Sequence, residues 1–483
     1  MRLMSGTVIV QIIAFASAPL MTRLFTPEAF GVAAVFIAVI TICNTFATFR
    51  YNMAIVLPET DEDGFNLVCL CALCLILVVS IVTAVVFLVN EEVLARMKLT
   101  GIEPYLWLLP VGIFFSGAVA ILNGWNARLN EFARQSISNV SGRLVSTFGG
   151  ILAGMVGLTS GGILIAVNVG YSVFVFLVLA FLSYSSVFGC NAPKVSWEKV
   201  KGLASRYRKF PLVTSWSSLL SAVSIGLPAF FLTAYFSTAI AGLYALSYRM
   251  IVLPLQMIGG AISGVFLRKA AEARHNGGLT QLTNKTFRNL VLIAAFPFAL
   301  IGLFGPELFA RIFGEGWREA GAYSRILCPW IFFIFIGGPL MSLSVVLECQ
   351  GLALVFNIIF VVSRVVSLVS GGLMGDPKMA LMLYSLSGVL VWFLFLSFLM
   401  QRAGSSWVVI LRYILKDGIV SLLCLVPVLL CFLYWTENVF LLLGGCGFGA
   451  LFYFRYVWRS SPEVQRAISQ AIQSVVGIRK YAK

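Results

Sequence analysis

Long apolar stretches separated by short polar segments run along the whole chain. Fourteen stretches are free, or nearly free, of charged residues, and their lengths lie close to the about 20 residues that a helix needs to span a bilayer. They comprise residues 4–21, 31–49, 67–89, 105–124, 137–158, 163–188, 212–235, 240–267, 289–304, 326–347, 353–374, 379–400, 418–435 and 439–454. They lack the alternation of apolar and polar residues that is typical of membrane β-barrels. The pattern therefore predicts an all-α integral membrane protein with about 14 transmembrane helices.

Two parts of the chain repeat each other at an offset of six predicted helices. With a shift of 221 residues, Arg143 falls on Arg364, and three of the next seven positions are identical. With a shift of 211 residues, Gly31 falls on Gly242. Since six is an even number, the two halves have the same orientation in the membrane and are related by an axis along its normal. The repeat predicts two pseudo-symmetric six-helix lobes, followed by two further helices.

The predicted helices and the repeat divide the chain into five parts. These are an N-terminal lobe at 1–193, a cytoplasmic amphipathic linker at 194–210, a C-terminal lobe at 211–402, helices thirteen and fourteen within 403–458, and a basic tail at 459–483. The linker and the tail carry apolar residues at helical spacing among basic ones, which is typical of helices at a membrane surface. We therefore expect both segments to lie flat on the cytoplasmic leaflet.

The charged residues set the orientation of the helices and exclude several function classes. The chain has 34 Lys and Arg, 19 Asp and Glu, and 60% hydrophobic residues, which excludes a soluble enzyme. With connections assigned alternately to two sides, 24 basic residues fall on the side of the N-terminus, 7 on the other, and three inside predicted spans. The positive-inside rule therefore predicts that both termini are cytoplasmic. The net charge of +15 fits loops that face anionic membrane lipids, so we expect no nucleic acid partner.

The sequence offers little for metal or enzyme chemistry. His275 is the single histidine. Cys69, Cys71 and Cys74 have the spacing of a metal cluster, but they open a predicted membrane helix without histidine or carboxylate partners. The acidic run at 61–63 contains the Asp-x-Asp pattern of nucleotide-sugar transferases, yet no cytoplasmic domain that could hold a nucleotide follows it. We interpret this run as the acidic start of a helix, and we predict neither a metal nor a cofactor.

Arginines inside the predicted spans are the strongest candidates for a binding site. Arg143, Arg249 and Arg364 lie in apolar stretches, and an arginine at the bilayer centre costs about 2.5–3.5 kcal/mol. No Asp or Glu lies firmly inside a predicted span, so an anionic substrate such as a pyrophosphate could supply the missing charge. Alternatively, these side chains reach the interface or bind backbone carbonyls. The repeat places Arg143 and Arg364 across the pseudo-twofold axis. Arg23 and Arg50, at the mouths of the first two helices, are further candidates.

Three segments resemble a known family of transporters. They are TRLFTPEAFG at 22–31, RYNMAIVLP at 50–58 and FGEGWREA at 313–320. They are similar to segments of the Wzx-type O-antigen and polysaccharide flippases of the MOP (MATE/MurJ-like) superfamily. The similarity covers essentially the whole chain, and the Arg-Tyr-x-x-Ala-Ile-x-Leu-Pro segment is its most specific part.

The resemblance implies a fold and a function. It implies two lobes around a cationic central cavity and a multi-pass protein of the bacterial inner membrane. Such a flippase moves an undecaprenyl-pyrophosphate-linked oligosaccharide from the cytoplasmic to the periplasmic leaflet by alternating access, beside other membrane proteins of polysaccharide assembly. It would not be an enzyme, and the intramembrane arginines would bind the pyrophosphate.

Three alternatives stay open at this point. A MurJ-like lipid II flippase would also use arginines in its cavity, although the quoted segments look more Wzx-like. A MATE-type drug exporter usually has an acidic residue in the membrane, which the predicted spans lack. A glycan polymerase or ligase would need an external catalytic platform, whereas the longest predicted outside connection, about 305–325, is short and contains no histidine.

Overall fold

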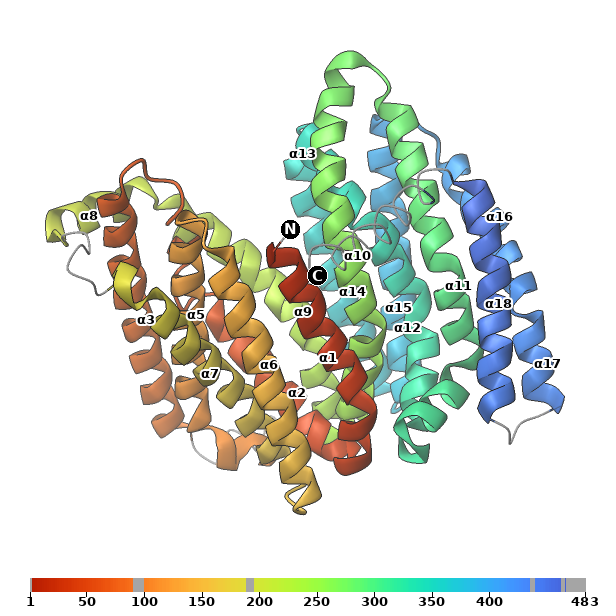
Figure 1. Ribbon diagram of the computed structural model, residues 1–483, viewed down its shortest axis with the longest axis horizontal. Coiled ribbons are helices and arrows are strands. Elements are labelled where there is room, and N and C mark those ends of the chain that lie inside the picture. Colours follow the sequence, from red (N-terminus) through yellow and green to blue (C-terminus); the bar gives the residue numbers. More distant parts are fainter. Residues whose placement is uncertain (1, 90–99, 188–194, 435–438, 462–464, 466–483) are drawn as a thin grey trace, which may run out of the picture. The chain divides into compact units, whose positions relative to one another are not determined.

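The protein is a bundle of long helices. The computed structural model describes residues 2–89, 100–187, 195–434, 439–461 and 465, and within these residues every regular element is a helix (Figure 1). Twelve of the helices are long and apolar enough to cross a membrane. Each of the fourteen apolar stretches overlaps a helix, so the predicted class of an all-α, multi-pass membrane protein is confirmed.

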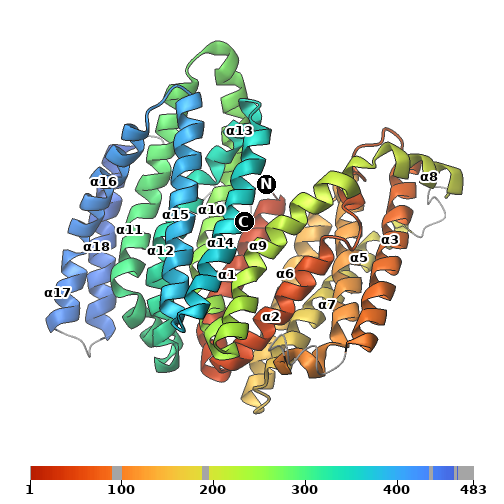
Figure 2. The same cartoon turned by 180° about the vertical axis from the view of Figure 1, so that it is seen from behind.

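The chain forms two compact units. The first contains Met1–Met257, Phe309–Tyr323 and Arg364–Leu383. Its main helices are α1 (Arg2–Leu24), α2 (Pro27–Asn44), α3 (Asp61–Leu88), α5 (Leu108–Arg128), α6 (Phe132–Met155), α7 (Gly161–Val187), α8 (Trp197–Arg206), α9 (Ser215–Tyr235) and the first part of α10 (Thr238–Asn276). Within this unit α1 packs on α6, and α2 packs on α7 and α9 (Figure 2). The unit thereby surrounds α2 with other helices.

The second unit contains Ile258–Leu308, Ser324–Ser363 and Tyr384–Lys483. Its helices are the rest of α10, most of α11 (Leu279–Phe313) and α12 (Arg318–Gly337), α13 (Ser342–Val346), the first part of α14 (Gln350–Leu373), the end of α15 (Pro377–Arg402), α16 (Trp407–Cys424), α17 (Val426–Tyr434) and α18 (Val439–Ser460). Leu292 and Phe296 of α11 pack with Val428 of α17 and Tyr453 of α18 in its core. The lobe boundaries expected from the repeat stay a prediction.

Helix starts follow the capping residues in the sequence. Thr26 precedes α2, and its side-chain oxygen accepts a hydrogen bond from the backbone N–H of Ala29 at 3.4 Å. Thr60 precedes α3 and accepts from the N–H of Asp63 at 3.3 Å. The acidic run at 61–63 forms the first turn of α3, where negative charge stabilises the helix dipole. The interpretation of this run as a helix start is confirmed.

Helices α2 and α10 cross at a contact between their backbones. The crossing lies at Gly31 and Gly242, the two glycines that the repeat aligns. A Cβ atom added at Gly31 would overlap the carbonyl oxygen of Thr238, and one added at Gly242 would overlap that of Pro27. Since these obstacles are backbone atoms, no side-chain rotation could relieve the overlap. The two helices can therefore approach this closely only with glycine at both positions.

We expect the substitution Gly31→Ala to destabilise the protein. The added methyl group would force α2 and α10 apart and cost about 1–3 kcal/mol, as overpacking does elsewhere. Thermal unfolding of the purified protein in detergent measures this loss. The matched control is Gly170→Ala in α7, where the added Cβ meets no atom within 4 Å. Equal melting temperatures for the two variants would contradict the close crossing.

Helix α16 begins earlier than the apolar pattern predicts. It starts at Trp407, not at 418, because the Ser406 side chain accepts a hydrogen bond from the N–H of Val408 at 3.3 Å and caps the helix. Its first turns contain Arg412, Lys416 and Asp417, which interrupt the apolar pattern. The pattern therefore does not show where the helix begins. The expectation that no acid lies inside a span is therefore wrong, since Asp417 is fully buried within α16.

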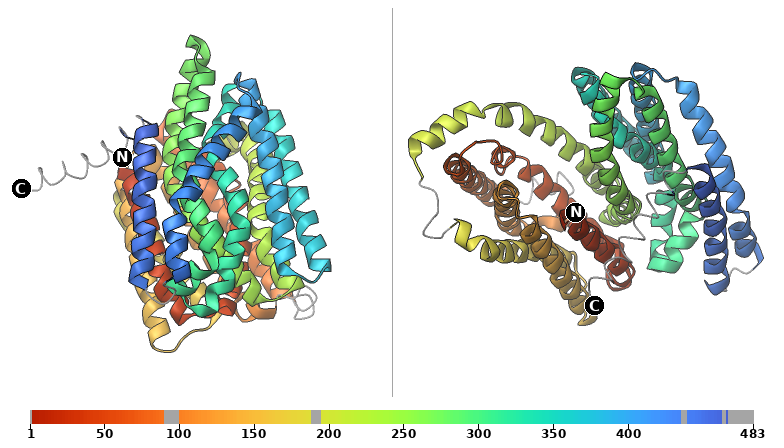
Figure 3. Two further views of the ribbon diagram at one scale, coloured as in Figure 1. Left: turned by 90° about the vertical axis from the view of Figure 1, so that its right-hand side faces the viewer. Right: turned by 45° about the horizontal axis from the view of Figure 1, so that its top comes forward.

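The amphipathic linker contains α8, and its apolar face packs on protein. Val200 and Leu203 of α8 are buried in the first unit, where α8 packs on α3. Lys199 of α8 forms an ion pair with Glu62 at 2.8 Å, and the Tyr51 hydroxyl donates to the backbone carbonyl of Ala204 at 3.1 Å. Two residues of the apolar face of α8 are thus covered by protein, whereas Trp197 is exposed, and the position of the linker on the cytoplasmic leaflet stays a prediction. Figure 3 shows the helical turn Phe210–Thr214 running without a break into α9. The expectation for the tail falls almost entirely outside the described residues.

Candidate functional site

A cavity of 510 Å³ in the first unit brings together two of the predicted arginines. Arg143 of α6 and Arg249 of α10 both line it, and we call it the arginine cavity. Residues of α1, α2, α7 and α9 complete its wall, and most of them are apolar or small. The lining also includes polar side chains, among them Ser17, Thr41, Ser146, Thr147, Asn168 and Tyr171. The cavity therefore combines a mostly apolar wall with two permanent positive charges.

The surroundings of Arg143 orient its guanidinium but leave it without a counter-charge. The group lies 5.1 Å from the ring centroid of Tyr171, whose hydroxyl donates to Asn139 at 3.2 Å. The Nε atom of Arg143 is buried and has no hydrogen-bond partner among the described residues. A cation stacked on an aromatic ring is held in place by the electron-rich face of that ring. Arg143 thus keeps a donor for a ligand that enters the cavity.

Arg249 shares the cavity and adds a second uncompensated charge. Its side chain lies on α10 and forms part of the cavity wall. The positive charge of Arg143 acts on it electrostatically. In the part of the chain that the structure describes, no carboxylate forms an ion pair with either arginine. Two like charges in one weakly polar space repel each other, so an anion would stabilise both.

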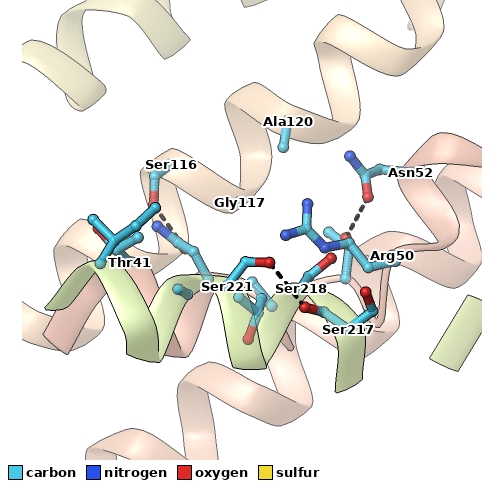
Figure 4. Close-up of a pocket in the computed structure, with 15 residues that line it drawn as sticks. Thr41, Arg50, Asn52, Ser116, Gly117, Ala120, Ser217, Ser218 and Ser221 are labelled. Carbon is cyan, nitrogen blue, oxygen red and sulfur yellow. Dashed lines mark hydrogen bonds between the residues drawn. The ribbon is translucent and has the colours of Figure 1, made fainter. Parts of the chain in front are cut away.

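A second cavity, of 520 Å³, contains Arg50 and is lined mainly by polar side chains (Figure 4). It lies between α2, the turn after α2, α5 and α9, and we call it the polar cavity. Its hydroxyl, amide and guanidinium groups belong to Thr41, Asn44, Thr45, Thr48, Arg50, Asn52, Ser116, Ser217, Ser218 and Ser221. Figure 4 shows Arg50 reaching from the turn toward the serines of α9. The lining offers both donors and acceptors for hydrogen bonds.

Arg50 is held in a strained backbone conformation. Its φ is +60°, in the left-handed region that residues other than glycine rarely adopt. The Nε atom is buried without a hydrogen-bond partner among the described residues, and burial lowers the pKa of the guanidinium below its ordinary value. Such strain persists only where the surrounding structure enforces it, and it is frequent at functional sites.

Some hydroxyl groups of the polar cavity already donate hydrogen bonds to its amide oxygens. The polar cavity also adjoins the arginine cavity. The Ser116 hydroxyl donates to Asn44 Oδ1 at 2.9 Å, and the Thr48 hydroxyl donates to Asn52 Oδ1 at the same distance. Thr41, Ala222 and Ile225 line both cavities. A ligand could therefore contact the two cavities at once if it extended past these three residues.

The structure places Arg364 and Arg23 elsewhere. Arg364 is 3% exposed, and its Nη1 donates to the side-chain oxygen of Ser224 at 2.9 Å and to the Ser224 carbonyl at 3.1 Å. It lines neither cavity, so the repeat-related Arg143 and Arg364 have different surroundings. Arg23 is exposed near the end of α1 and also lines neither cavity. A direct role for either of them in substrate binding stays a prediction.

The polar cavity was not predicted, although its residues leave a signal in the sequence. Thr41 lies three and four residues before Asn44 and Thr45, and Thr48 lies four and three residues after them, which places all four on one face of a helix. Ser217 and Ser221 repeat the spacing of four on α9. Clusters of hydroxyl and amide groups on one face of otherwise apolar helices thus mark the cavity. Tyr171 gives no comparable signal, because a single tyrosine in a span is common.

Comparisons with known proteins identify a family for the chain and structures of similar fold. Residues 20–322 match the family described as "Polysaccharide biosynthesis protein". A structure described as "Lipid II flippase MurJ, inward closed conformation" has a TM-score of 0.76 at 14% identity, covering 96% of this chain and 99% of that chain. An inward-facing multidrug resistance MATE family transporter of the MOP superfamily has a TM-score of 0.56 at 13% identity, with 84% and 95% covered. No curated protein sequence matches the chain. The predicted MOP-type fold is thereby confirmed.

Proposed function

The chain belongs to the polysaccharide biosynthesis protein family, and from that premise we propose that it is a flippase for a lipid-linked oligosaccharide. The proposed substrate is an undecaprenyl-pyrophosphate-linked repeat unit of O-antigen type. It would move from the cytoplasmic to the periplasmic leaflet of a bacterial inner membrane, with both protein termini in the cytoplasm. The observation that carries this proposal is the arginine cavity, where Arg143 and Arg249 lie together without a carboxylate partner among the described residues.

The arginine cavity suits the pyrophosphate group of this substrate. A pyrophosphate presents several acceptor oxygens and more than one negative charge, and guanidinium groups bind such oxygens with paired donors. In this proposal, the unpaired Nε of Arg143 donates to the pyrophosphate, and Arg249 neutralises its remaining charge. Binding would also remove the repulsion between the two arginines. We therefore assign the main binding role to this pair, whereas Arg364 already has Ser224 as its partner.

The polar cavity suits the sugars. Saccharide hydroxyls both donate and accept hydrogen bonds, as do the hydroxyl and amide side chains that line this cavity. Because Thr41, Ala222 and Ile225 line both cavities, a glycan attached to a pyrophosphate in the arginine cavity could extend into the polar cavity. Arg50 would bind an acidic sugar or the pyrophosphate from that side. The polyprenyl tail would stay in lipid.

Transport of this kind needs no bond chemistry. Rigid movement of one lobe against the other would open the binding site to alternate sides of the membrane. Moving one charge across 100 mV changes the free energy by about 2.3 kcal/mol. An interior-negative potential would therefore favour outward movement of the anionic head group.

A MurJ-like lipid II flippase is the second candidate. The similarity to the MurJ structure, which covers nearly the whole length of both chains, favours it. Lipid II and the proposed substrate share the pyrophosphate and the polyprenyl tail, so the arginine cavity suits both. The difference lies in the glycan, which would contact the polar cavity.

Proteoliposomes that contain the purified protein distinguish these functions. We expect a fluorescent undecaprenyl-pyrophosphate-linked oligosaccharide to cross the bilayer faster than lipid II with the same label, while its glycan keeps its length. Faster movement of lipid II would favour the second candidate. A lengthened glycan would indicate a polymerase, and movement of neither lipid above that in protein-free liposomes would refute both flippase assignments.

A further inference from the structure

Asp417 is a buried acid in the second unit that the proposed transport path does not use. It is 0% exposed and lies within α16, about 15 Å along the helix from Trp407 at 1.5 Å per residue. The apolar segment Trp407–Cys431 that contains it is long enough to cross the membrane. A buried carboxylate is costly unless neighbours neutralise it or bind its oxygens. The neighbours of Asp417 must therefore offset the cost of burying its carboxyl group.

The hydrogen bonds of Asp417 are incomplete. Its Oδ1 accepts a hydrogen bond of 2.7 Å from the Tyr456 hydroxyl of α18. Its Oδ2 is buried and has no hydrogen-bond partner among the described residues. Ser421 lies four residues later on the same face of α16 and is 0% exposed. Its hydroxyl oxygen likewise has no hydrogen-bond partner among the described residues. An ionised carboxylate has room for about four donors, whereas this one has a single donor.

The charged and titratable groups around Asp417 come from three helices. Arg288 of α11 and Lys416 of α16 act on it as positive charges. Tyr456 and Tyr453 are the titratable groups on α18 that interact with it. Arg288 lies with its guanidinium 5.6 Å from the Tyr413 ring centroid, and in the described residues it forms no ion pair with Asp417. The Arg288 guanidinium thus acts on the Asp417 carboxylate electrostatically without forming an ion pair with it.

We propose that Asp417, between Tyr456 and Ser421, is a binding site for a proton within the membrane. In the protonated state the proton lies on Oδ2, and the neutral acid suits a site with one hydrogen-bond donor. In the deprotonated state the carboxylate keeps the hydrogen bond from Tyr456, and Arg288 balances its charge. Proton binding therefore changes the electrostatic attraction between α16 and α11.

This site is separate from the arginine cavity. Asp417, Tyr456 and Arg288 belong to the second unit, whereas the residues of the arginine cavity belong to the first. The proposal consequently does not depend on the proposed substrate. A direct measurement of protonation can test it without any transport assay.

Infrared difference spectroscopy of the full-length protein in liposomes tests the site, with protons as the only ligand. A protonated carboxyl group has a carbonyl stretch that is well separated from the bands of the carboxylate. Between about pH 6.5 and about pH 9, exposed acids are almost fully ionised, so they contribute little change. We expect the wild-type protein to lose one carboxylic acid band in this range. The Asp417→Asn variant should show no such loss, whereas the control Asp376→Asn, at an exposed turn, should match the wild type.

A second variant keeps the acid and removes its donor. In Tyr456→Phe the carboxylate loses its hydrogen bond, so the charged form becomes less stable and the acid band should persist to higher pH. This variant decides the matter even if Asp417→Asn does not fold. Identical titrations of the wild type and Tyr456→Phe, or an acid band that survives in a folded Asp417→Asn protein, would overturn the proposal.

Discussion

Replacement of both Arg143 and Arg249 by glutamine is expected to reduce transport of a pyrophosphate-linked oligosaccharide by at least about 100-fold. A hydrogen bond to a charged group contributes about 1.5–3 kcal/mol, which corresponds to about 10- to 150-fold for each arginine. Because both side chains line one cavity, each single variant keeps one cation and should retain a measurable rate. Glutamine preserves much of the side-chain length and removes the charge. The measurement is the initial rate of lipid movement in proteoliposomes.

The control for this experiment is Arg318→Gln. Arg318 is exposed and pairs with Glu315 at 2.9 Å, so its loss removes a positive charge of the same unit outside both cavities. The amounts of folded protein in the liposomes must match before rates are compared. A wild-type rate for a correctly folded Arg143→Gln, Arg249→Gln double variant would show that the cavity does not bind the substrate.

The substitution Arg50→Gly should separate stability from transport. Glycine adopts φ near +60° without strain, and the strain relieved, of about 1–2 kcal/mol, exceeds the entropic cost of glycine, so the folded state gains up to about 1 kcal/mol. The same change removes the guanidinium from the polar cavity, and we expect transport to fall about 10- to 100-fold. Melting temperature and transport rate are measured on the same preparation.

Asn130 provides a matched control for the backbone effect. It has φ of +58° in the turn between α5 and α6, and it lines neither cavity. Because asparagine tolerates this conformation, Asn130→Gly should change the melting temperature little and leave transport unchanged. If Arg50→Gly behaved like Asn130→Gly in both measurements, Arg50 would have no part in binding.

The apolar pattern predicts most helices because the bilayer requires long uncharged segments. This physical constraint explains why α3 and α7 could be placed from sequence. It fails at α16, where a buried acid and two basic residues lie in a helix whose Ser406 cap was the better signal. At α8 the amphipathic pattern does not distinguish protein from lipid as the cover of the apolar face, and the structure shows that protein covers Val200 and Leu203.

The site was predicted in part, since the cost of a charge in an apolar span identifies Arg143 and Arg249 individually. Their meeting in one cavity depends on the packing of α6 and α10, which sequence spacing does not contain. The repeat suggested Arg364 as the partner of Arg143. However, Arg364 donates to two acceptors of Ser224 on α9, whereas the guanidinium of Arg143 lies over the ring of Tyr171. Equivalent positions in a duplicated fold thus acquire different neighbours.

The crossing of α2 and α10 has a mechanical consequence. At Gly31 and Gly242 the two helices touch through main-chain atoms, so no side chain separates them at this point. Helix α2 forms walls of both cavities, and α10 carries Arg249. Rotation of α10 about this glycine contact would move the Arg249 guanidinium relative to α2 and thereby change the width of the arginine cavity.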